Sequence, residues 1–315
     1  MTQPIRIGIV AQLDDAARDL CMRELSADEV VWSSGDWNPE LAECEVVFGN
    51  VPGDWLPRLT ALRWLQLESI GFESYAPYVD EIRARTIEVT NLRGLFANPV
   101  AETVLAGVLA LLRGIDQVML AAVERRWATA EIRPTTDLLH ARTAVVLGTG
   151  SIGAQVRRLL EAFDCTVLSY AKSSPDAELH TLAELDAALA TAGIVASCLP
   201  STPETIRIFD AERLALLGDR TIFANVGRGT AVDEGALIAA ITTGSLGGAV
   251  LDVTGREPLP EESPLWSLPR TILTQHTGGG YRDELLDKAR RFIDNLARWR
   301  EGRPVVNAVN WEDGY

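Results

Sequence analysis

Apolar residues follow two alternating patterns along this chain. Short runs rich in β-branched residues predict strands, and longer stretches with apolar residues three or four positions apart predict amphipathic helices. In the first part of the chain, a helix is expected at residues 14–25 and strands at residues 5–10, 30–32, 45–49, 63–67 and 86–90. Such alternation is typical of a parallel sheet with helices on both faces.

The same alternation returns further along the chain. A long helix is expected at residues 98–113, and its apolar residues cover more than one face, which indicates burial between layers. An irregular excursion at 125–140 precedes strands at 145–147, 166–170, 194–199, 221–226, 247–253 and 271–275. Thr181 and Glu184 form a capping-box pattern, and another helix is expected from Asp210 to Gly218. A final amphipathic helix at 282–301 leads to an extended tail, 304–309, that is expected to dock on the first domain.

Composition excludes several classes of protein. The chain has 315 residues, enough for two domains, and its net charge of −15 argues against a nucleic-acid or anionic-membrane partner. Its four cysteines are scattered without CxxC or metal-type spacing, so we expect no metal site and no disulfide framework. The N-terminus has the pattern of a strand rather than of a signal peptide, and no apolar run has the length of a membrane span. A reduced, cytoplasmic protein is expected.

The strongest motif is a glycine-rich turn at the end of a predicted strand. The sequence Gly148-Thr149-Gly150-Ser151-Ile152-Gly153 lies between the apolar run at 145–147 and a helical pattern that continues to Phe163. In this context the first glycine permits a tight turn, the second lets the backbone approach a pyrophosphate, and the third lets the helix pack against the strand. An ordinary glycine-rich turn is the alternative. We interpret the motif as a dinucleotide-binding site.

Other candidate groups also follow predicted strands. Ligands of open parallel sheets bind beyond the carboxyl ends of the strands, which is where Arg228, Asp252 and His276 occur. His140 and His180 are expected at the surface, whereas His276 precedes a run of three glycines suited to a site. Each candidate also has an interpretation without a role in a site. Arg228 could form a phosphate or surface ion pair, Asp252 could cap a helix or turn, and His276 could be a capping histidine.

These motifs together resemble the D-2-hydroxyacid dehydrogenase family over nearly the whole chain. The matching segments, whose order and spacing also agree, are Gly148–Gly153, Leu199-Pro200-Ser201-Thr202-Pro203-Glu204-Thr205, Asn225-Val226-Gly227-Arg228-Gly229, Leu251-Asp252-Val253, Glu257-Pro258 and His276. The resemblance implies a Rossmann dinucleotide-binding domain, residues 99–282, inserted into a flavodoxin-like substrate-binding domain, residues 1–98 with 283–315. It also implies a homodimer built through the cofactor domain.

The resemblance assigns roles residue by residue. Arg228 is similar to the arginine that holds the substrate carboxylate, His276 to the general acid/base, and Glu257 to its carboxylate partner, although a solvated loop acid is an alternative for Glu257. The amides of Ile70 and Gly71 resemble the nest that grips the substrate carboxylate. The implied cofactor contacts come from Gly148, Gly150, Ser151, Ile152, Gly153, Lys172, Ser173, Leu199, Pro200, Thr205, Val226, Asp252 and Gly278.

The chain departs from the family pattern at two places. Gln275 replaces the proline that commonly precedes the catalytic histidine. Ala171 stands where an acid usually binds the ribose 2′-hydroxyl of NAD. Without that carboxylate, Lys172 and the hydroxyls of Ser173 and Ser174 suit a 2′-phosphate, so NADP is favoured and NAD is the alternative.

We therefore predict an NAD(P)H-dependent reductase of small 2-oxo acids such as glyoxylate or hydroxypyruvate. One alternative is a cofactor-sensing, corepressor-type binding protein on the same fold. Another is a dehydrogenase of a bulkier or phosphorylated 2-oxo acid, which Glu68 would disfavour if its carboxylate faced the substrate.

Overall fold

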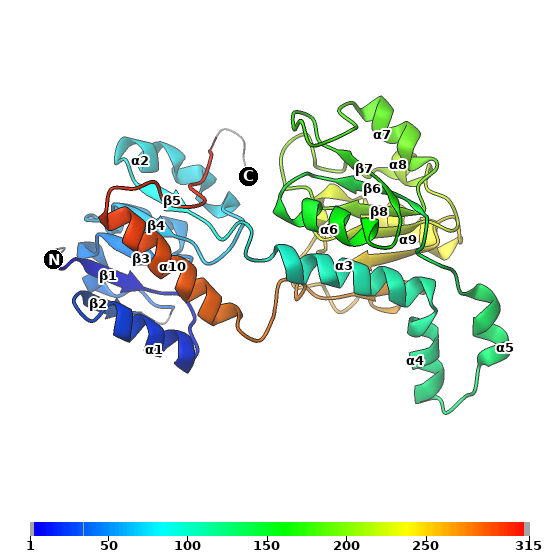
Figure 1. The fold of residues 1–315 in the computed structure, drawn as a ribbon, viewed down its shortest axis with the longest axis horizontal. Helices are drawn as coiled ribbons and strands as arrows, with labels where there is room; N and C mark the ends of the chain where they lie inside the picture. Colours follow the sequence, from blue (N-terminus) through cyan, green and yellow to red (C-terminus); the bar gives the residue numbers. More distant parts are fainter. Residues whose placement is uncertain (1–2, 34, 312–315) are drawn as a thin grey trace. The chain divides into compact units, whose positions relative to one another are not determined.

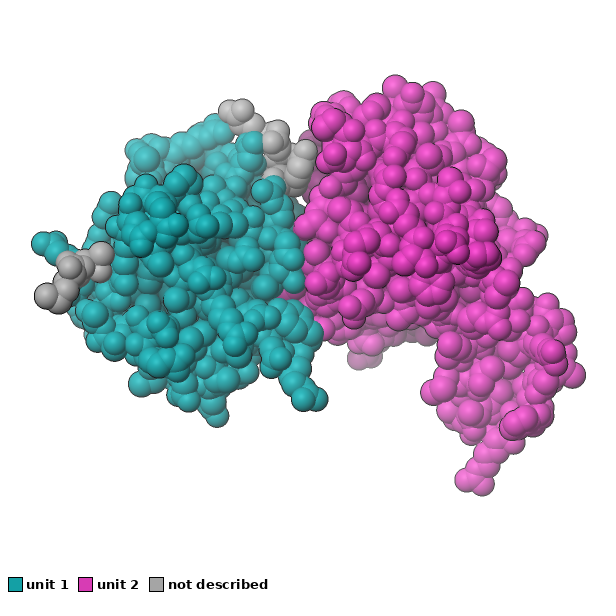
Figure 2. Space-filling model, in the orientation of Figure 1, with its two compact units in different colours: residues 1–95, 281–315 teal, residues 96–280 magenta. Residues whose placement is uncertain are grey.

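The computed structural model describes residues 3–33 and 35–311, and the chain divides into two compact units (Figure 1, Figure 2). Unit 1 comprises residues 1–95 and 281–315, and unit 2 comprises residues 96–280. The domain boundaries expected from the sequence, 98/99 and 282/283, lie a few residues from these divisions.

Unit 1 is a parallel five-stranded sheet in the order β2-β1-β3-β4-β5. This is the doubly wound order of flavodoxin-like folds, as the sequence alternation predicts. Its elements are β1 (Arg6–Ile9), α1 (Asp15–Glu24), β2 (Glu29–Trp32), β3 (Val46–Phe48), β4 (Trp64–Gln66), α2 (Val79–Ala84), β5 (Glu88–Thr90) and α10 (Glu284–Arg300).

The final helix and the tail belong to unit 1. On α10, Phe292 stacks against Phe48 of β3 at 4.6 Å and against Trp64 of β4 at 5.6 Å, so the helix covers one face of the sheet. The tail then pairs with β5: the Val309 amide donates to the Val89 carbonyl at 2.8 Å, and Ala308 forms an antiparallel bridge with Thr90. The prediction that the tail docks on the first domain is confirmed.

Unit 2 is a parallel six-stranded sheet in the order β11-β10-β9-β8-β6-β7. Its strand order reverses between β6 and β8, the kind of point at which doubly wound sheets bind ligands. Its strands are β6 (Thr143–Leu147), β7 (Thr166–Tyr170), β8 (Ile194–Ser197), β9 (Ile222–Asn225), β10 (Gly248–Leu251) and β11 (Thr271–Leu273). Its helices are α3 (Ala97–Leu112), α4 (Ile115–Val123), α5 (Thr129–Ile132), α6 (Ser151–Glu161), α7 (Leu182–Leu189), α8 (Ala211–Leu214) and α9 (Glu234–Thr242).

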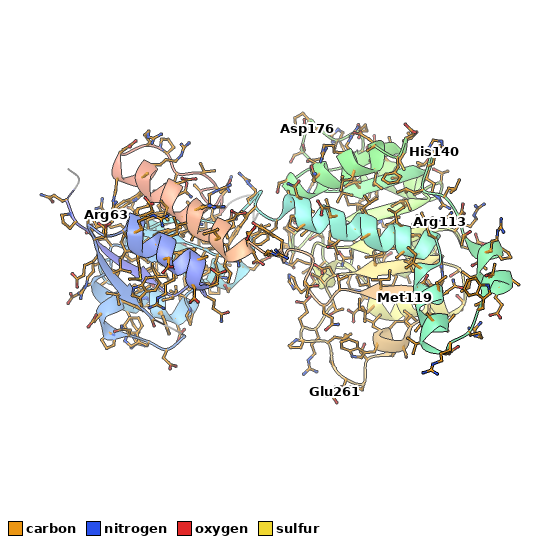
Figure 3. The ribbon with its side chains drawn as sticks, turned by 60° about the horizontal axis from the view of Figure 1, so that its bottom comes forward. Arg63, Arg113, Met119, His140, Asp176 and Glu261 are labelled. Carbon is orange, nitrogen blue, oxygen red and sulfur yellow. The ribbon has the colours of Figure 1, made fainter. Side chains whose placement is uncertain are left out.

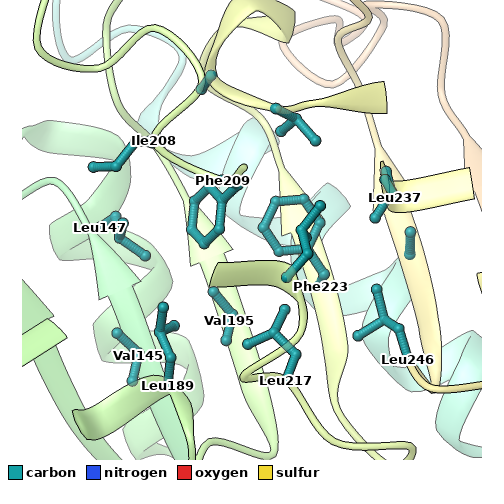
Figure 4. Close-up of a cluster of buried hydrophobic side chains, with 14 of the residues drawn as sticks. Val145, Leu147, Leu189, Val195, Ile208, Phe209, Leu217, Phe223, Leu237 and Leu246 are labelled. Atoms are coloured by element: carbon teal, nitrogen blue, oxygen red, sulfur yellow. The ribbon is translucent and has the colours of Figure 1, made fainter. Parts of the chain in front are cut away.

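Alternate strand residues of unit 2 enter two separate cores. Val146 and Ala196 pack with α3 and α6 on one face, whereas Val145 and Val195 pack with α7 and α9 on the other. Phe209 and Phe223 meet edge to face at 4.7 Å within the second core (Figure 4). Because both faces are covered, the strands are apolar on both sides, which is why their sequence shows runs rather than alternation. The predicted burial of α3 is confirmed.

Two sequence predictions need correction. The helix expected from Asp210 to Gly218 is shorter, because the chain leaves α8 at Leu214, turns with a Leu217 amide bond to the Leu214 carbonyl, and enters β9. The stretch after α3 contains a helix that was not predicted, α4, which with α5 projects from the rest of unit 2 (Figure 1). Among the described residues no single helix has the length and apolarity of a membrane span; α3 and α4 together meet that criterion with a 70° bend between them.

Candidate active site

The candidate residues of unit 2 lie at one edge of its sheet. Parallel pairing aligns the last residues of neighbouring strands, from Tyr170 through Leu147, Ser197, Asn225 and Leu251 to Leu273. Each candidate cofactor or catalytic residue of this unit follows one of these strands in the sequence. The prediction that the strand ends assemble a site is therefore consistent with the register.

The glycine-rich turn has the geometry of a dinucleotide cradle. Gly148 has φ of +100° and donates its amide to the Tyr170 carbonyl at 2.9 Å. A Cβ on Gly153 would lie 1.9 Å from the Gly148 carbonyl oxygen, whereas a Cβ on Gly150 would have no atom within 4 Å. Gly150 begins α6 without a side-chain cap, so the helix presents its first amides to open space. This arrangement fits a pyrophosphate at a helix N-terminus.

The end of β7 carries no acid at the position of the ribose. Lys172 and Ser173 are exposed, and the Ala171 carbonyl lies 2.9 Å from Nδ1 of His180. One acid lies within electrostatic range: the pKa of Glu204 is lowered by hydrogen bonds from its own backbone and from Thr202, and also by the charge of Lys172. Glu204 could not be predicted as a neighbour of Lys172, because the two residues lie in different loops.

The loops after β8 and β9 pack backbone to backbone. A Cβ on Gly227 would lie 2.3 Å from the Leu199 carbonyl oxygen, which explains the glycine before Arg228. Within the first loop the Thr205 hydroxyl donates to the Pro200 carbonyl at 2.6 Å, so Thr205 shapes the turn. Leu199 and Val226 are buried.

Asn225 fixes the backbone around Arg228. Its Nδ2 donates to the Arg228 carbonyl at 3.0 Å, and its Oδ1 accepts the Gly227 amide at 3.3 Å. The guanidinium Nη1 of Arg228 donates to the Gly227 carbonyl at 2.9 Å. Asn225 belongs to the matching segment at 225–229, but this supporting role was not predicted.

Glu257 and His276 form a hydrogen-bonded pair. Oε2 of Glu257 lies 2.6 Å from Nδ1 of His276, and Oε1 accepts the Thr254 amide at 3.0 Å. Because an ionised carboxylate only accepts hydrogen bonds, Nδ1 carries a proton and Nε2 remains for a reacting atom. The pair borders a cavity of about 400 Å³, whose lining also includes Leu251, Asp252, Thr254, Pro258, Leu259, Trp266, Leu273 and Gln275.

The structure gives a physical reason for Gln275 in place of proline. Gln275 has φ of +52° and His276 has φ of +58°. The proline ring holds φ near −65° and cannot adopt this left-handed conformation. Gln275 therefore permits the left-handed backbone that leads into His276, which a proline at this position could not adopt. His140 and His180 are exposed, as expected.

Ile70 and Gly71 follow β4 in unit 1. Two hydrogen bonds to backbone carbonyls hold this loop. Asn91 Nδ2 donates to the Ile70 carbonyl at 2.9 Å, and the Ser69 hydroxyl donates to the Gly71 carbonyl at 2.7 Å. Neither the Ile70 nor the Gly71 amide donates to an acceptor in the part of the chain that the structure describes. These amides have the chemistry of a carboxylate nest.

Comparison with known proteins gives consistent matches. Residues 105–278 match the family model of the D-isomer specific 2-hydroxyacid dehydrogenase NAD binding domain. The chain is 34% identical over 263 residues to a glyoxylate/hydroxypyruvate reductase B of Escherichia fergusonii, covering 81% of this chain and 80% of the relative.

Solved structures match over both units. A D-isomer specific 2-hydroxyacid dehydrogenase from Xanthobacter autotrophicus Py2, in complex with NADPH and MES, has a TM-score of 0.81 at 28% identity, covering 99% of this chain and 100% of that one. An NADPH-dependent glyoxylate/hydroxypyruvate reductase from Sinorhizobium meliloti, in complex with NADP and malonate, has a TM-score of 0.81 at 25% identity, covering 98% of each chain.

Proposed function

The chain belongs to the D-isomer specific 2-hydroxyacid dehydrogenase family, and on that premise we propose that it reduces glyoxylate, hydroxypyruvate or a similarly small 2-oxo acid. It is an oxidoreductase that acts on the CH–OH group of donors, with a nicotinamide cofactor. The product has the D configuration where it is chiral. The protein works in the cytoplasm.

The observation that carries the proposal is the pair of Glu257 and His276 beside the edge that holds the glycine turn. When bound, the reduced nicotinamide supplies a hydride to C2 of the substrate. His276 gives the proton on Nε2 to the carbonyl oxygen, and Glu257 stabilises the imidazolium before that transfer. Because the His276 side chain is 58% exposed, solvent returns the proton.

Substrate binding follows from charge and hydrogen-bond geometry. The planar guanidinium of Arg228 binds the substrate carboxylate and polarises the carbonyl. The amides of Ile70 and Gly71 have the chemistry to bind a carboxylate, so residues 1–98 with 283–315 serve as the substrate-binding domain and residues 99–282 as the dinucleotide-binding domain. Asp252 and Gly278 contact the nicotinamide end of the cofactor.

NADP is the preferred cofactor. The absence of an acid at Ala171 removes repulsion of a 2′-phosphate, and the exposed Lys172 and Ser173 supply a cation and a hydroxyl. Leu199, Pro200, Thr205 and Val226 line the adenosine and nicotinamide path, and the amides of Ser151 and Ile152 bind the pyrophosphate.

The protein is a homodimer built through unit 2. The arm formed by α4, α5 and their connection (residues 115–132) exposes large apolar side chains. Met119, labelled in Figure 3, lies on this arm and is 62% exposed. Trp127 is 93% exposed. Beneath them Ala121, Ala128 and Ile132 form a small separate core that keeps the arm ordered. Apolar surface of this extent on a projecting element is typical of a protein interface.

The test is oxidation of NADPH and NADH with glyoxylate, hydroxypyruvate, pyruvate and a bulky 2-oxo acid. Turnover of the small acids with NADPH supports the proposal, and a His276→Ala variant must abolish it. Preference for the bulky acid would indicate the alternative substrate class. Cofactor binding without turnover of any acid would favour a cofactor-sensing binding protein instead.

A further inference from the structure

His276 lies in an uncommon backbone conformation. Both Gln275 and His276 have positive φ, +52° and +58°, although neither is glycine. A residue with a Cβ adopts the left-handed region at an energetic cost and keeps it only where surrounding contacts over-determine it. Two such residues in succession therefore need several contacts that stabilise the left-handed backbone.

Those contacts converge on Asp252, which is only 5% exposed. Its backbone carbonyl accepts the His276 amide at 2.6 Å, and its Oδ1 accepts the Gly278 amide at 2.9 Å. Asp252 therefore holds the backbone on both sides of Thr277. Of these two bonds, the one to the carboxylate oxygen Oδ1 is charge-assisted, and such a bond is strong in a buried setting.

The carboxylate itself is fixed by Thr274. The Thr274 hydroxyl donates to the same Oδ1 at 2.6 Å, and the Thr274 carbonyl accepts both the amide of Thr277, at 3.0 Å, and its hydroxyl, at 2.5 Å. Thr274 also continues the sheet, because its amide donates to the Leu251 carbonyl at 3.0 Å. One threonine thus joins β11, the Asp252 carboxylate and the turn that follows His276.

We propose that Thr274 is a positioning residue: its hydroxyl orients the Asp252 carboxylate, which holds the Gly278 amide and so the turn that follows His276. The Asp252 backbone carbonyl holds the His276 amide, and together these bonds keep His276 in the left-handed conformation against Glu257. This latch, defined as Thr274, Asp252 and the amides of His276 and Gly278, rests on the proposed function for its catalytic consequence. Its structural part stands independently of any activity.

The test compares Thr274→Val with two control variants. Thr274→Ser keeps the hydroxyl at this position. Thr271→Val removes a hydroxyl from β11, outside the latch. We expect Thr274→Val to lower kcat roughly ten-fold, because the acid His276 is displaced while the glycine turn at 148–153 is intact. The Thr274→Ser and Thr271→Val variants keep the parent kcat. Hydrogen exchange at the Gly278 amide accelerates in Thr274→Val alone, because the carboxylate that accepts this amide loses the bond that orients it.

A second substitution separates positioning from general destabilisation. Glycine adopts the left-handed region without a Cβ penalty, so Gln275→Gly in the Thr274→Val background is expected to restore most of the lost kcat. A merely structural defect would not be relieved, and such a result would overturn the proposal. Normal kcat and normal exchange in Thr274→Val would also overturn it.

Hydrogen exchange of the parent protein tests the latch without any variant. Exchange of His276 and Gly278 as fast as in an unstructured peptide would exclude the latch even if Thr274→Val fails to fold. Absence of reductase activity in the parent protein, with these amides protected, would refute the proposed function and leave the latch standing.

Discussion

Oε2 of Glu257 lies 2.6 Å from Nδ1 of His276, while Oε1 of the same carboxylate accepts the Thr254 amide. Glu257→Gln has a single acceptor oxygen, so it can keep only one of these two bonds, and it loses the charge that stabilises imidazolium. We expect kcat to fall about 100-fold with unchanged cofactor affinity, within the range of general acid–base effects. Steady-state kinetics and NADPH fluorescence titration test this. Parent-like kcat would remove Glu257 from the catalytic set.

The glycines of the turn should respond differently to alanine. At Gly153 a Cβ would collide with the Gly148 carbonyl, so Gly153→Ala must shift the backbone and is expected to lower the melting temperature. At Gly150 a Cβ enters open space, so Gly150→Ala should keep that temperature and weaken dinucleotide binding roughly ten-fold or more. Gly218→Ala, where the Cβ makes only ordinary contact, is the control. Unchanged affinity in Gly150→Ala would exclude the pyrophosphate from this turn.

The fold was predictable because both sheets are buried on both faces. The run at 166–170 has the bounds of β7, and the capping box of Thr181 and Glu184 forms as expected. In contrast, β11 ends at Leu273 rather than at Gln275, because the backbone turns left-handed there. A glutamine gives no local signal of positive φ, so this departure could not be predicted from the sequence.

The site was predictable in its residue types but not in its supporting bonds. The resemblance pointed to Glu257 and His276, and the structure brings these side chains into contact. Asn225 and Thr274 were missed as supporting residues, because a polar residue near a strand end has the same pattern whether it braces a loop or faces solvent.

The arm should control assembly. Because Met119 and Trp127 are exposed within unit 2, we expect Met119→Glu with Trp127→Glu to weaken dimerisation about 100-fold by placing charges in an apolar interface. Light scattering after size-exclusion chromatography measures the mass across a dilution series. Leu182→Glu, at an exposed leucine of α7, is the control. A dimer that persists in the arm variant would assign the interface elsewhere.

Acid stability should depend on Asp137. Burial alone would raise its pKa, but hydrogen bonds from Arg220, the Leu138 amide and Arg142 outweigh burial and lower the pKa to about 2, from an ordinary 3.8. A lowered pKa means that this stabilisation is complete above the ordinary value and is lost as the pH falls toward about 2. Asp137→Asn should therefore cost roughly 1 kcal/mol at neutral pH and less in acid.

Urea unfolding across that pH range measures the difference between parent and variant. Asp176→Asn, at an exposed acid of the same unit, is the control. A free-energy difference between Asp137→Asn and the parent that stays constant with pH would show that ionisation of Asp137 is not the cause.

Cofactor preference should depend on charge near the end of β7. Lys172→Ala is expected to weaken NADPH binding about ten-fold without changing NADH binding, since only the 2′-phosphate needs the cation. Glu204 lies within electrostatic range of Lys172, so Glu204→Gln should strengthen NADPH binding and again leave NADH unchanged. Ala171→Asp should reverse the preference, because a carboxylate repels the phosphate and accepts the ribose hydroxyl.

Titrations of both cofactors at two salt concentrations distinguish charge from shape, because a phosphate contact weakens with salt. Equal losses for NADPH and NADH in Lys172→Ala would mean that Lys172 supports the loop and that the phosphate site lies elsewhere.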